Sequence, residues 1–135
     1  MDKKKVLFLC TGNSCRSQMA EGFAKHYFNS KYDFYSAGIE AHGLNPLAIK
    51  VMLEEYIDIS NNKSKTLSDI GNINFDIVIT VCDDANEKCP VYLKEAKLIH
   101  KSFKDPAKAK GTEKEVLEVF RKVRNQIKFY ITQSF

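Results

Sequence analysis

Apolar and polar positions divide the chain into short strand-like runs and longer helix-like segments. Four apolar runs rich in strand-forming residues are expected to be strands, at 4–9, 34–37, 75–81 and 96–99. Between them, apolar residues recur every three or four positions from Ser17 and again from Asn45, where Pro46 suits the first turn of a helix. The run at 4–9 does not alternate, which is typical of a strand buried on both faces of a parallel sheet.

The end of the chain predicts one long helix over 112–131. Its apolar stripe is expected to comprise Val116, Phe120, Val123, Ile127 and Tyr130, with lysine and arginine on the opposite side. Two further segments are polar. We interpret 60–68 as a loop that leads into a short helix, and 82–90 as a polar segment whose composition permits mobility.

Strands that alternate with helices predict an α/β fold, here a single domain over residues 1–135 with a parallel sheet flanked by helices. Ligands bind such sheets beyond the carboxyl ends of the strands. That rule selects the segments that follow the first, third and fourth expected strands. These segments contain Cys10, Cys82 and Asp105.

Composition narrows the classes of function. The chain has 135 residues and a formal net charge of +4, which suits a small anionic substrate and is too small an excess to indicate nucleic acid. Its first apolar run, Val6–Cys10, is shorter than the roughly 7–15 residues of a signal-peptide core and the about 20 of a membrane span. We therefore expect a cytoplasmic protein that contacts no membrane.

In a reducing cytoplasm, four cysteines indicate catalysis or metal binding rather than structural disulfides. Zinc ligands are usually separated by about two to four residues. Neither Cys10 with Cys15 nor Cys82 with Cys89 fits that spacing, and the three histidines are scattered. We therefore expect no metal site.

The loop after the first strand combines a cysteine, an arginine and the start of a helix. Such a loop directs backbone N–H groups inward, and Gly12 permits the close approach of an anion. Arg16 adds the planar pair of donors that suits a tetrahedral oxyanion, and this positive field favours the thiolate of Cys10. Ser17 is expected to cap the helix and to donate to that thiolate, and Asn13 to brace the loop.

The alternative for this loop is a buried strand-end cysteine, a helix-capping serine and a surface arginine. A cysteine placed as Cys10 is relative to Arg16 is common by chance. The buried strand before it, and the serine and helix after it, favour a catalytic loop.

Cys82 and Cys89 form a second candidate site. Cys82 directly follows the strand at 75–81, and Cys89 lies seven positions on across polar residues, so a disulfide can close if the loop folds back. A reductase must supply two electrons, which a dithiol does by becoming a disulfide, whereas a phosphatase needs only one nucleophilic cysteine. Two spectator thiols are the alternative, and the spacing alone does not decide. Asp83 and Asp84 are expected to disfavour a Cys82 thiolate.

Asp105 precedes Pro106 after the last expected strand, where the fixed proline backbone would hold its carboxyl over the anion site. A surface turn is the commoner fate of an Asp-Pro pair. The surrounding segment 94–110 carries six lysines against Glu95 and Asp105, a balance of +4. We interpret it as a solvated basic face, with an anion-steering rim as the alternative.

The sequence CTGNSCRSQMAE at 10–21 resembles the phosphate-binding loop of the low-molecular-weight protein tyrosine phosphatase fold. It resembles more closely that of the thioredoxin-coupled arsenate reductases built on this fold. The likeness continues through residues 35–40, 42–43, 45–46, 58–60, the Cys82/Cys89 pair and Asp105-Pro106, and so covers essentially the whole chain. It implies a four-stranded parallel sheet in a Rossmann-like, three-layer arrangement.

The resemblance also implies a reaction. Cys10 attacks arsenate, and Asp105 protonates the leaving hydroxide as general acid. Cys82 then attacks Cys10 and arsenite leaves, Cys89 attacks Cys82, and thioredoxin reduces the resulting Cys82–Cys89 disulfide. The substrate-binding residues that it implies are Thr11, Gly12, Asn13, Ser14, Cys15, Arg16 and Ser17. It implies arsenic detoxification by a monomer with no bound cofactor.

One feature departs from parts of this family. Some members bind a potassium ion with groups that correspond here to Asn13, Glu21, Ser36 and positions 63 and 65. The last two are lysines in this chain, and lysine supplies no oxygen ligand and repels a cation, so we expect no potassium dependence. Cys15 is assigned no required role.

Two rival functions remain open. One is a tyrosine phosphatase that uses Cys10, Arg16 and Asp105. Those enzymes usually have an aromatic residue after the Asp-Pro pair, where this chain has Ala107, and the second pair of cysteines would have no use. The other is an oxyanion-binding or redox-sensing module without turnover.

Overall fold

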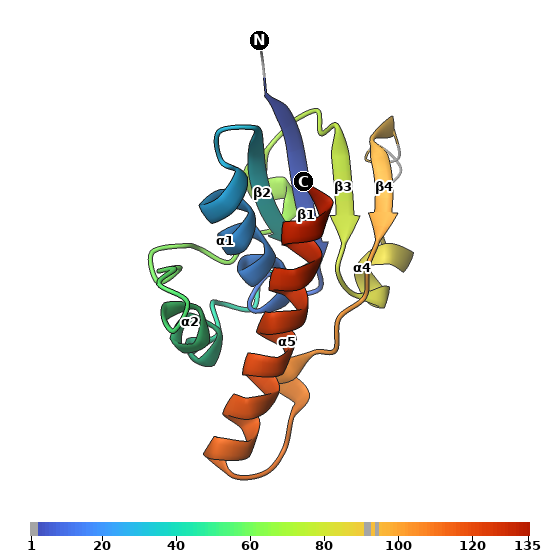
Figure 1. Cartoon of the computed structure of the whole chain (residues 1–135). Coiled ribbons are helices and arrows are strands. Elements are labelled where there is room, and N and C mark those ends of the chain that lie inside the picture. Colours follow the sequence, from blue (N-terminus) through green and yellow to red (C-terminus); the bar gives the residue numbers. More distant parts are fainter. Residues whose placement is uncertain (1–2, 91–92, 94) are drawn as a thin grey trace.

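In a computed structural model, which describes residues 3–90, 93 and 95–135, one sheet of four parallel strands has the order β2-β1-β3-β4 (Figure 1). The strands are β1 (Lys4–Cys10), β2 (Tyr32–Gly38), β3 (Ile77–Thr80) and β4 (Lys97–His100). This confirms the expected four-stranded parallel α/β sheet. Because all strands run in the same direction, their carboxyl ends meet at one edge.

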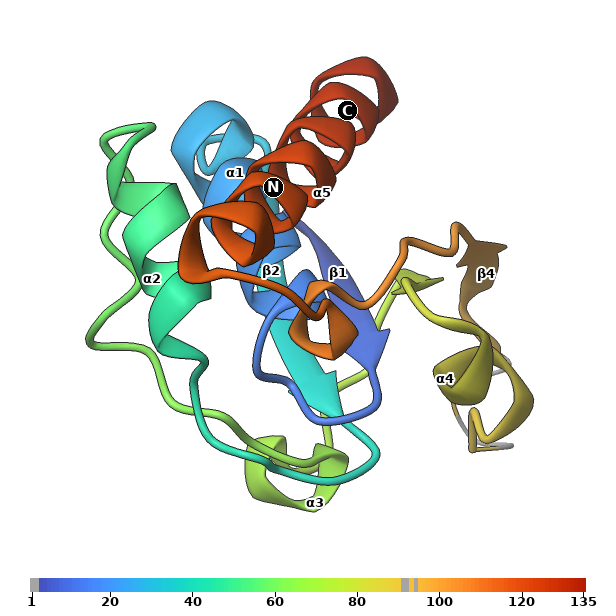
Figure 2. The ribbon, with the colours of Figure 1, turned by 90° about the horizontal axis from the view of Figure 1, so that it is seen from below.

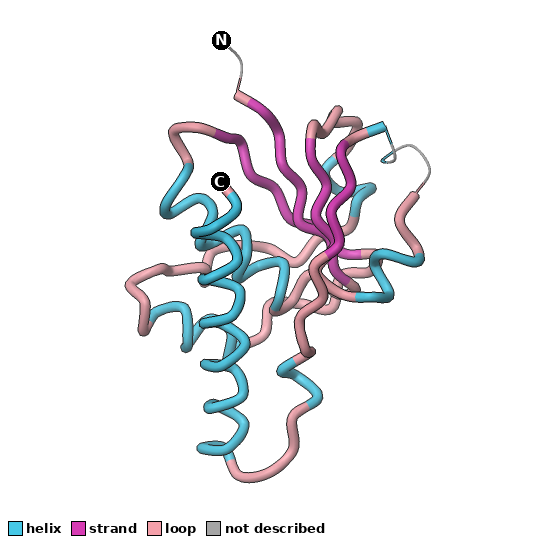
Figure 3. Tube along the Cα trace, turned by 45° about the vertical axis from the view of Figure 1, so that its right-hand side comes forward, coloured by secondary structure: helices cyan, strands magenta, loops and turns pink. Residues whose placement is uncertain are grey.

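Helices cover the sheet. They are α1 (Arg16–Phe28), α2 (Pro46–Leu53), α3 (Leu67–Ile70), α4 (Asp83–Glu87) and α5 (Glu113–Ser134), and a short 3-10 turn, η2, spans Pro106–Lys108. Helices α1, α2 and α5 contact one another on one face, and α3 lies on the opposite side (Figure 2). Figure 3 shows α5 running along that first face. Within the described part of the chain, no helix has the length and apolar character of a membrane span.

The core is centred on β1, between α1 with α5 on one face and the loops and short helices on the other. Residues Val6–Leu9 have no exposed surface, as the non-alternating run predicted. A fully buried side chain of this size contributes on the order of 1.5–3 kcal/mol. The last residue, Phe135, packs its ring against Phe8 and Phe34, so the end of α5 is attached to the sheet.

The buried face of α5 is turned relative to the expected stripe. Its buried residues are Leu117, Phe120, Val123, Arg124, Ile127 and Ile131. Val116 and Tyr130 of the expected stripe are only half-buried. Arg124 belongs to the buried face because its Nη1 donates to the backbone oxygen of Val51 at 3.0 Å and to Glu54 Oε1 at 2.7 Å. The ion pair with Glu54, the C-cap of α2, compensates the buried charge.

The segment 82–90, interpreted from its sequence as polar, contains the short helix α4, which its residue pattern did not predict. Cys82 is the N-cap of this helix, and Ala85 is its one buried residue. A helix of five residues with a single buried position cannot be recognised from the spacing of apolar residues. By contrast, the expected loop and short helix after 60–68 is confirmed as α3.

Candidate functional site

The strand order places two cysteines at the position where such sheets bind ligands. β1 lies between β2 and β3, so the chain leaves β1 toward one side and later returns on the other. Ligands bind open α/β sheets beyond the carboxyl ends of the strands, at this reversal. Cys10 is the last residue of β1, and Cys82 lies two residues after the end of β3. Both therefore lie at the reversal.

A cavity of about 400 Å³ opens over the loop after β1. Its lining residues are Cys10, Thr11, Gly12, Ser14, Cys15, Arg16, His42, Asp105, Ala107 and Lys108. An adjoining cavity shares Thr11, Arg16, Asp105 and Lys108 with the first and adds Cys82. The tertiary structure thus brings the cysteine loop, the turn at Asp105 and the second cysteine together.

The backbone of the loop is oriented by the segment that follows β2. The carbonyl groups of residues 10–12 accept hydrogen bonds from the N–H groups of Ile39, Glu40 and His42 at 2.8–3.0 Å. These carbonyl groups already accept hydrogen bonds from the backbone. The loop therefore presents N–H groups to a bound anion. The N–H of Asn13 donates to Cys10 Sγ at 3.3 Å.

The Ser17 hydroxyl is placed to donate a hydrogen bond to the Cys10 sulfur. Cys10 Sγ lies 2.8 Å from Ser17 Oγ, and both residues are buried. Asn13 Nδ2 donates to Ser17 Oγ at 2.8 Å and to Ser36 Oγ at 3.0 Å. An amide nitrogen only donates, so Ser17 accepts this bond and its own proton is available to the sulfur. This is the arrangement that a thiolate nucleophile requires.

The amide of Asn13 is itself held in this orientation. Its Oδ1 accepts hydrogen bonds from Gln18 Nε2 at 2.9 Å and from the backbone N–H of Lys65 at 3.0 Å. The backbone φ of Asn13 is 49°, a left-handed value that asparagine tolerates better than most residues. Asn13 therefore braces the loop as expected, although most of its partners are side chains.

A buried carboxylate lies behind this network. Glu21 accepts a hydrogen bond from the Ser36 hydroxyl and forms an ion pair with Lys25 at 2.7 Å. Lys65 Nζ lies 3.4 Å from Ser36 Oγ and 3.8 Å from Glu21 Oε1. An ammonium group thus lies beside the groups that correspond to potassium ligands in some members of the family that the sequence resembles.

Arg16 and Asp105 face the same cavity from different elements. Arg16 Nη1 donates to the backbone oxygen of Phe103 at 3.1 Å, and Nη2 lies 3.7 Å from Asp105 Oδ2. Asp105 Oδ1 accepts the N–H of Ala107 at 3.0 Å and so caps η2. The Asp-Pro pair therefore forms a turn that directs a carboxyl group, paired with a guanidinium, toward the cysteine loop.

Cys82 is joined to the cysteine loop through Thr11. Its buried Sγ accepts the N–H of Ala85 at 3.4 Å and lies 3.3 Å from Thr11 Oγ1. The same Thr11 hydroxyl donates to Asp84 Oδ2 at 3.2 Å. A hydrogen bond from Lys88 lowers the pKa of Asp84, so the negative charge beside Cys82 is partly compensated. Cys89, two residues beyond α4, is half-buried.

The start of α1 differs from the expected one. Its N-cap is Cys15, without a side-chain capping bond. Ser17, expected as the cap, lies inside the first turn and contacts Cys10 instead. Burial raises the pKa of the Cys15 thiol to about 12, so this thiol stays neutral although it lines the cavity.

His42 lies at the site, although the sequence did not indicate it as a site residue. A Cβ at Gly12 would lie 2.3 Å from His42 Nδ1, so the imidazole ring occupies the space that any larger residue at position 12 would need. His42 lines the cavity, and its Nε2 lies 2.6 Å from Glu40 Oε2. Its position could have indicated this, because His42 follows β2 and ligands bind beyond the carboxyl ends of parallel strands. Among the five lysines of 94–110 that the structure describes, only Lys108 lines the loop cavity.

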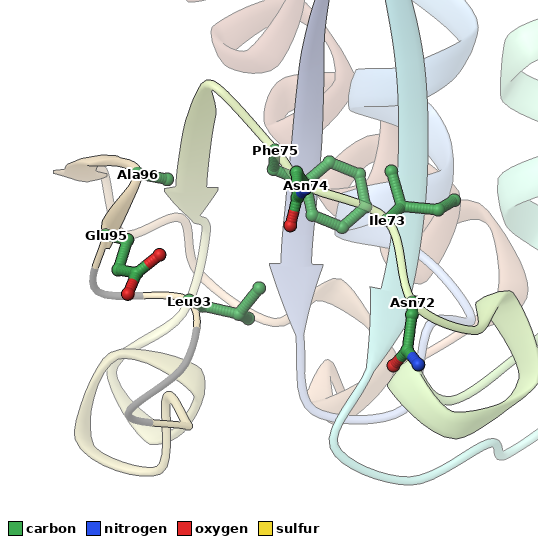
Figure 4. Close-up of a pocket in the computed structure, with 7 residues that line it drawn as sticks. All are labelled: Asn72, Ile73, Asn74, Phe75, Leu93, Glu95 and Ala96. Carbon is green, nitrogen blue, oxygen red and sulfur yellow. The ribbon is translucent and has the colours of Figure 1, made fainter.

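Figure 4 shows a separate hollow, formed by the segments that precede β3 and β4. The residues lining it are Asn72, Ile73, Asn74, Phe75, Leu93, Glu95 and Ala96. It lies toward the amino ends of these strands, opposite the edge with the cysteine loop. We assign no chemistry to it.

A thiol in an anion-binding loop, opposite an arginine and a carboxyl group at the reversal of a parallel sheet, is typical of enzymes that attack tetrahedral oxyanions through cysteine. The matched family agrees with this class. Residues 5–134 match the family described as low molecular weight phosphotyrosine protein phosphatase, and the chain belongs to that family.

Proteins similar to this chain include arsenate reductases and a tyrosine phosphatase. An arsenate reductase of Bacillus subtilis is 56% identical over 94% of this chain and 91% of its own length. Arsenate reductase 1 of Staphylococcus saprophyticus is 46% identical over 97% of this chain and 95% of its own. A solved arsenate reductase in the phosphate binding state is 36% identical, with a TM-score of 0.77 over 96% of this chain and 95% of its own. A low molecular weight protein tyrosine phosphatase from T. tengcongensis is 27% identical, with a TM-score of 0.77 over 97% of each chain.

Proposed function

We propose that this protein is an arsenate reductase in which Cys10, Cys82 and Cys89 act in turn and thioredoxin supplies the electrons. The single observation that carries the proposal is the position of Cys82, whose sulfur lies 3.3 Å from the hydroxyl of Thr11, the residue next to Cys10. A phosphatase has no use for a second thiol there. The relatives named arsenate reductase, 45–56% identical to this chain, support the same substrate.

In the first step the Cys10 thiolate attacks the arsenic atom of arsenate. The loop N–H groups and Arg16 bind the oxygens, and Ser17 donates to the sulfur until the new bond forms. Asp105, which faces the same cavity, donates its proton to the leaving hydroxide, which departs as water. The product is an arsenic(V) group bound to Cys10.

In the second step Cys82 attacks the Cys10 sulfur. A Cys10–Cys82 disulfide forms, the sulfur–arsenic bond breaks, and its electron pair stays with arsenic, which leaves as arsenite. Two thiols have then supplied the two electrons that reduce arsenic(V) to arsenic(III). The contact through Thr11 places Cys82 at the edge of the loop before this step.

In the third step Cys89 attacks Cys82, which releases Cys10 and leaves a Cys82–Cys89 disulfide. Cys10 and Cys82 are buried, whereas Cys89 is half-buried, so each exchange moves the oxidised sulfur toward the surface. Thioredoxin reduces the last disulfide by thiol–disulfide exchange.

Disulfide mapping by mass spectrometry tests this relay. Reduced protein given excess arsenate without thioredoxin should release one arsenite per chain and contain a Cys82–Cys89 disulfide. Cys89→Ser should instead trap Cys10–Cys82, while Cys15→Ser, the matched control, should give the wild-type disulfide. Intact thiols in both the wild type and Cys89→Ser would refute the relay, and the absence of arsenite would favour a binding or sensing module.

A weak phosphatase activity is a second candidate, because Cys10, Arg16 and Asp105 share one cavity as phosphoryl transfer through cysteine requires. Ala107 lines that cavity and offers no aromatic ring to a phenol. We expect slow hydrolysis of p-nitrophenyl phosphate that Cys10→Ser abolishes and Cys89→Ser retains. Loss of this hydrolysis in Cys89→Ser would show that it does not come from the first step alone.

A further inference from the structure

His100, the last residue of β4, has a place in the structure that neither the anion cavity nor the proposed chemistry uses. Its Nδ1 lies 2.7 Å from Thr80 Oγ1, and its Nε2 lies 2.9 Å from Asp83 Oδ1. Thr80 is the last residue of β3, and Asp83 is the first residue of α4, next to Cys82. The imidazole therefore joins the sheet to the first turn of the helix that separates Cys82 from Cys89.

The two ends of this contact differ in rigidity. His100 and Thr80 are partners in the register of β3 and β4, and Thr80 is buried. On the other side, the Asp83 side chain is 79% exposed and belongs to a helix of five residues. His100 is thus fixed by the sheet, whereas Asp83 moves with the start of α4.

A disulfide between Cys82 and Cys89 is incompatible with this helix. The cysteines flank α4, which advances about 1.5 Å per residue, so its length keeps their Cα atoms beyond the roughly 4.4–6.8 Å that a disulfide allows. In addition, Cys82 Sγ caps the helix by accepting the N–H of Ala85. Using this sulfur in a disulfide removes that cap, so we expect α4 to open from its first turn, where Asp83 lies.

We propose that His100 is a positioning residue that stabilises the dithiol state of the Cys82–Cys89 pair by binding Asp83. The inference rests on the proposed relay. On oxidation each of the two thiols loses a proton, the pair gives up two electrons, and one sulfur–sulfur bond forms. Arsenate accepts the electrons in the proposed reaction. A contact present only in the dithiol state stabilises that state by its own free energy and so favours reduction of the disulfide.

The reduction potential of the pair tests the proposal, because a merely structural role would not change it. The full-length protein is equilibrated in dithiothreitol buffers of defined potential, and the Cys82–Cys89 disulfide is quantified by mass spectrometry. Asp83→Asn and His100→Ala should each increase the equilibrium constant for the disulfide about three- to fivefold. That is a potential about 15–20 mV lower, since a tenfold change corresponds to 29.6 mV. The double variant should shift no further than either single variant.

Glu87→Gln is the matched control. It removes one negative charge from an exposed position of the same helix, and it should change the equilibrium constant less than twofold. His100→Ala removes no negative charge, so a shift in the same direction as Asp83→Asn separates the contact from simple electrostatics. If His100→Ala does not fold, the exposed position of Asp83 lets Asp83→Asn and the control decide.

Unchanged potentials in Asp83→Asn and His100→Ala would overturn the proposal while leaving the relay intact. An equal shift in Glu87→Gln would overturn it as well. A wild-type protein that forms no Cys82–Cys89 disulfide at any potential would overturn both the proposal and the relay.

Discussion

Replacing Ser17 with alanine removes the hydroxyl that lies 2.8 Å from Cys10 Sγ. Ser17 is completely buried, so water cannot readily take the place of the hydroxyl. Asn13 Nδ2 donates to the same oxygen and leaves the Ser17 proton free, and a Cys10 thiolate has no proton, so Ser17 is the donor to the attacking sulfur. The variant should therefore remove a hydrogen-bond donor from the attacking sulfur and slow the attack on arsenate.

The magnitude follows from the type of bond. A hydrogen bond to a charged group contributes about 1.5–3 kcal/mol, and each 1.36 kcal/mol is a tenfold change in rate. The backbone N–H of Asn13 still donates to the sulfur at 3.3 Å, so the variant keeps one donor. We therefore expect the lower part of the range, a decrease of about 10- to 50-fold in kcat/KM for arsenate.

The assay combines steady-state reduction of arsenate with alkylation of Cys10 by iodoacetamide at pH 7, followed by mass spectrometry. Ser64→Ala is the matched control, because Ser64 Oγ donates to the Gly12 carbonyl at 2.8 Å and touches the same loop without reaching the sulfur. It should change kcat/KM less than threefold. A folded Ser17→Ala protein whose kcat/KM and alkylation rate stay within threefold of the wild type would refute the reasoning.

Three further outcomes are expected. Hydrogen bonds from Arg121 lower the pKa of Glu54 from 4.5 to about 2, so this carboxylate stabilises the folded state above about pH 5 and the contribution disappears as the pH falls toward 2. Glu54→Gln should therefore lower the free energy of unfolding by about 1 kcal/mol at pH 7, after allowance for solvent screening, and by almost nothing at pH 2, as measured with urea. Gly12→Ala should lower kcat/KM more than tenfold because its methyl group would meet the His42 ring, and adding His42→Ala should restore part of the loss. No restoration would contradict this steric account. Exchanging sodium for potassium should change kcat/KM less than twofold because the Lys65 ammonium already lies where a cation would bind, and a clear gain with potassium would contradict that reason.

Local patterns were sufficient for the elements that bury a continuous apolar surface. The first strand was predicted because both of its faces are buried, and the helix after it because its apolar residues recur at helical spacing. The period of α5 was also predicted, but its buried face only in part, because Phe120, Val123 and Ile127 are buried whereas Val116 and Tyr130 are half-buried. Arg124 is turned inward by its bond to Glu54, the C-cap of α2, and no feature within α5 indicates that contact. Helix α4 was not predicted because it has five residues and a single buried one, which is too few to give a helical period of apolar residues.

The same division applies to the site. The sequence by itself determined which chemical groups are available and in which order. A cysteine ends a buried strand, an arginine begins the next helix, and two more cysteines follow the third strand. The structure of each of these segments depends mainly on residues close to it in the sequence. The tertiary structure alone decided that Asp105 pairs with Arg16, that His42 packs on Gly12, and that His100 binds Asp83. These contacts join segments far apart in the chain, and their distances depend on the order in which the strands assemble, which no local pattern of residues encodes.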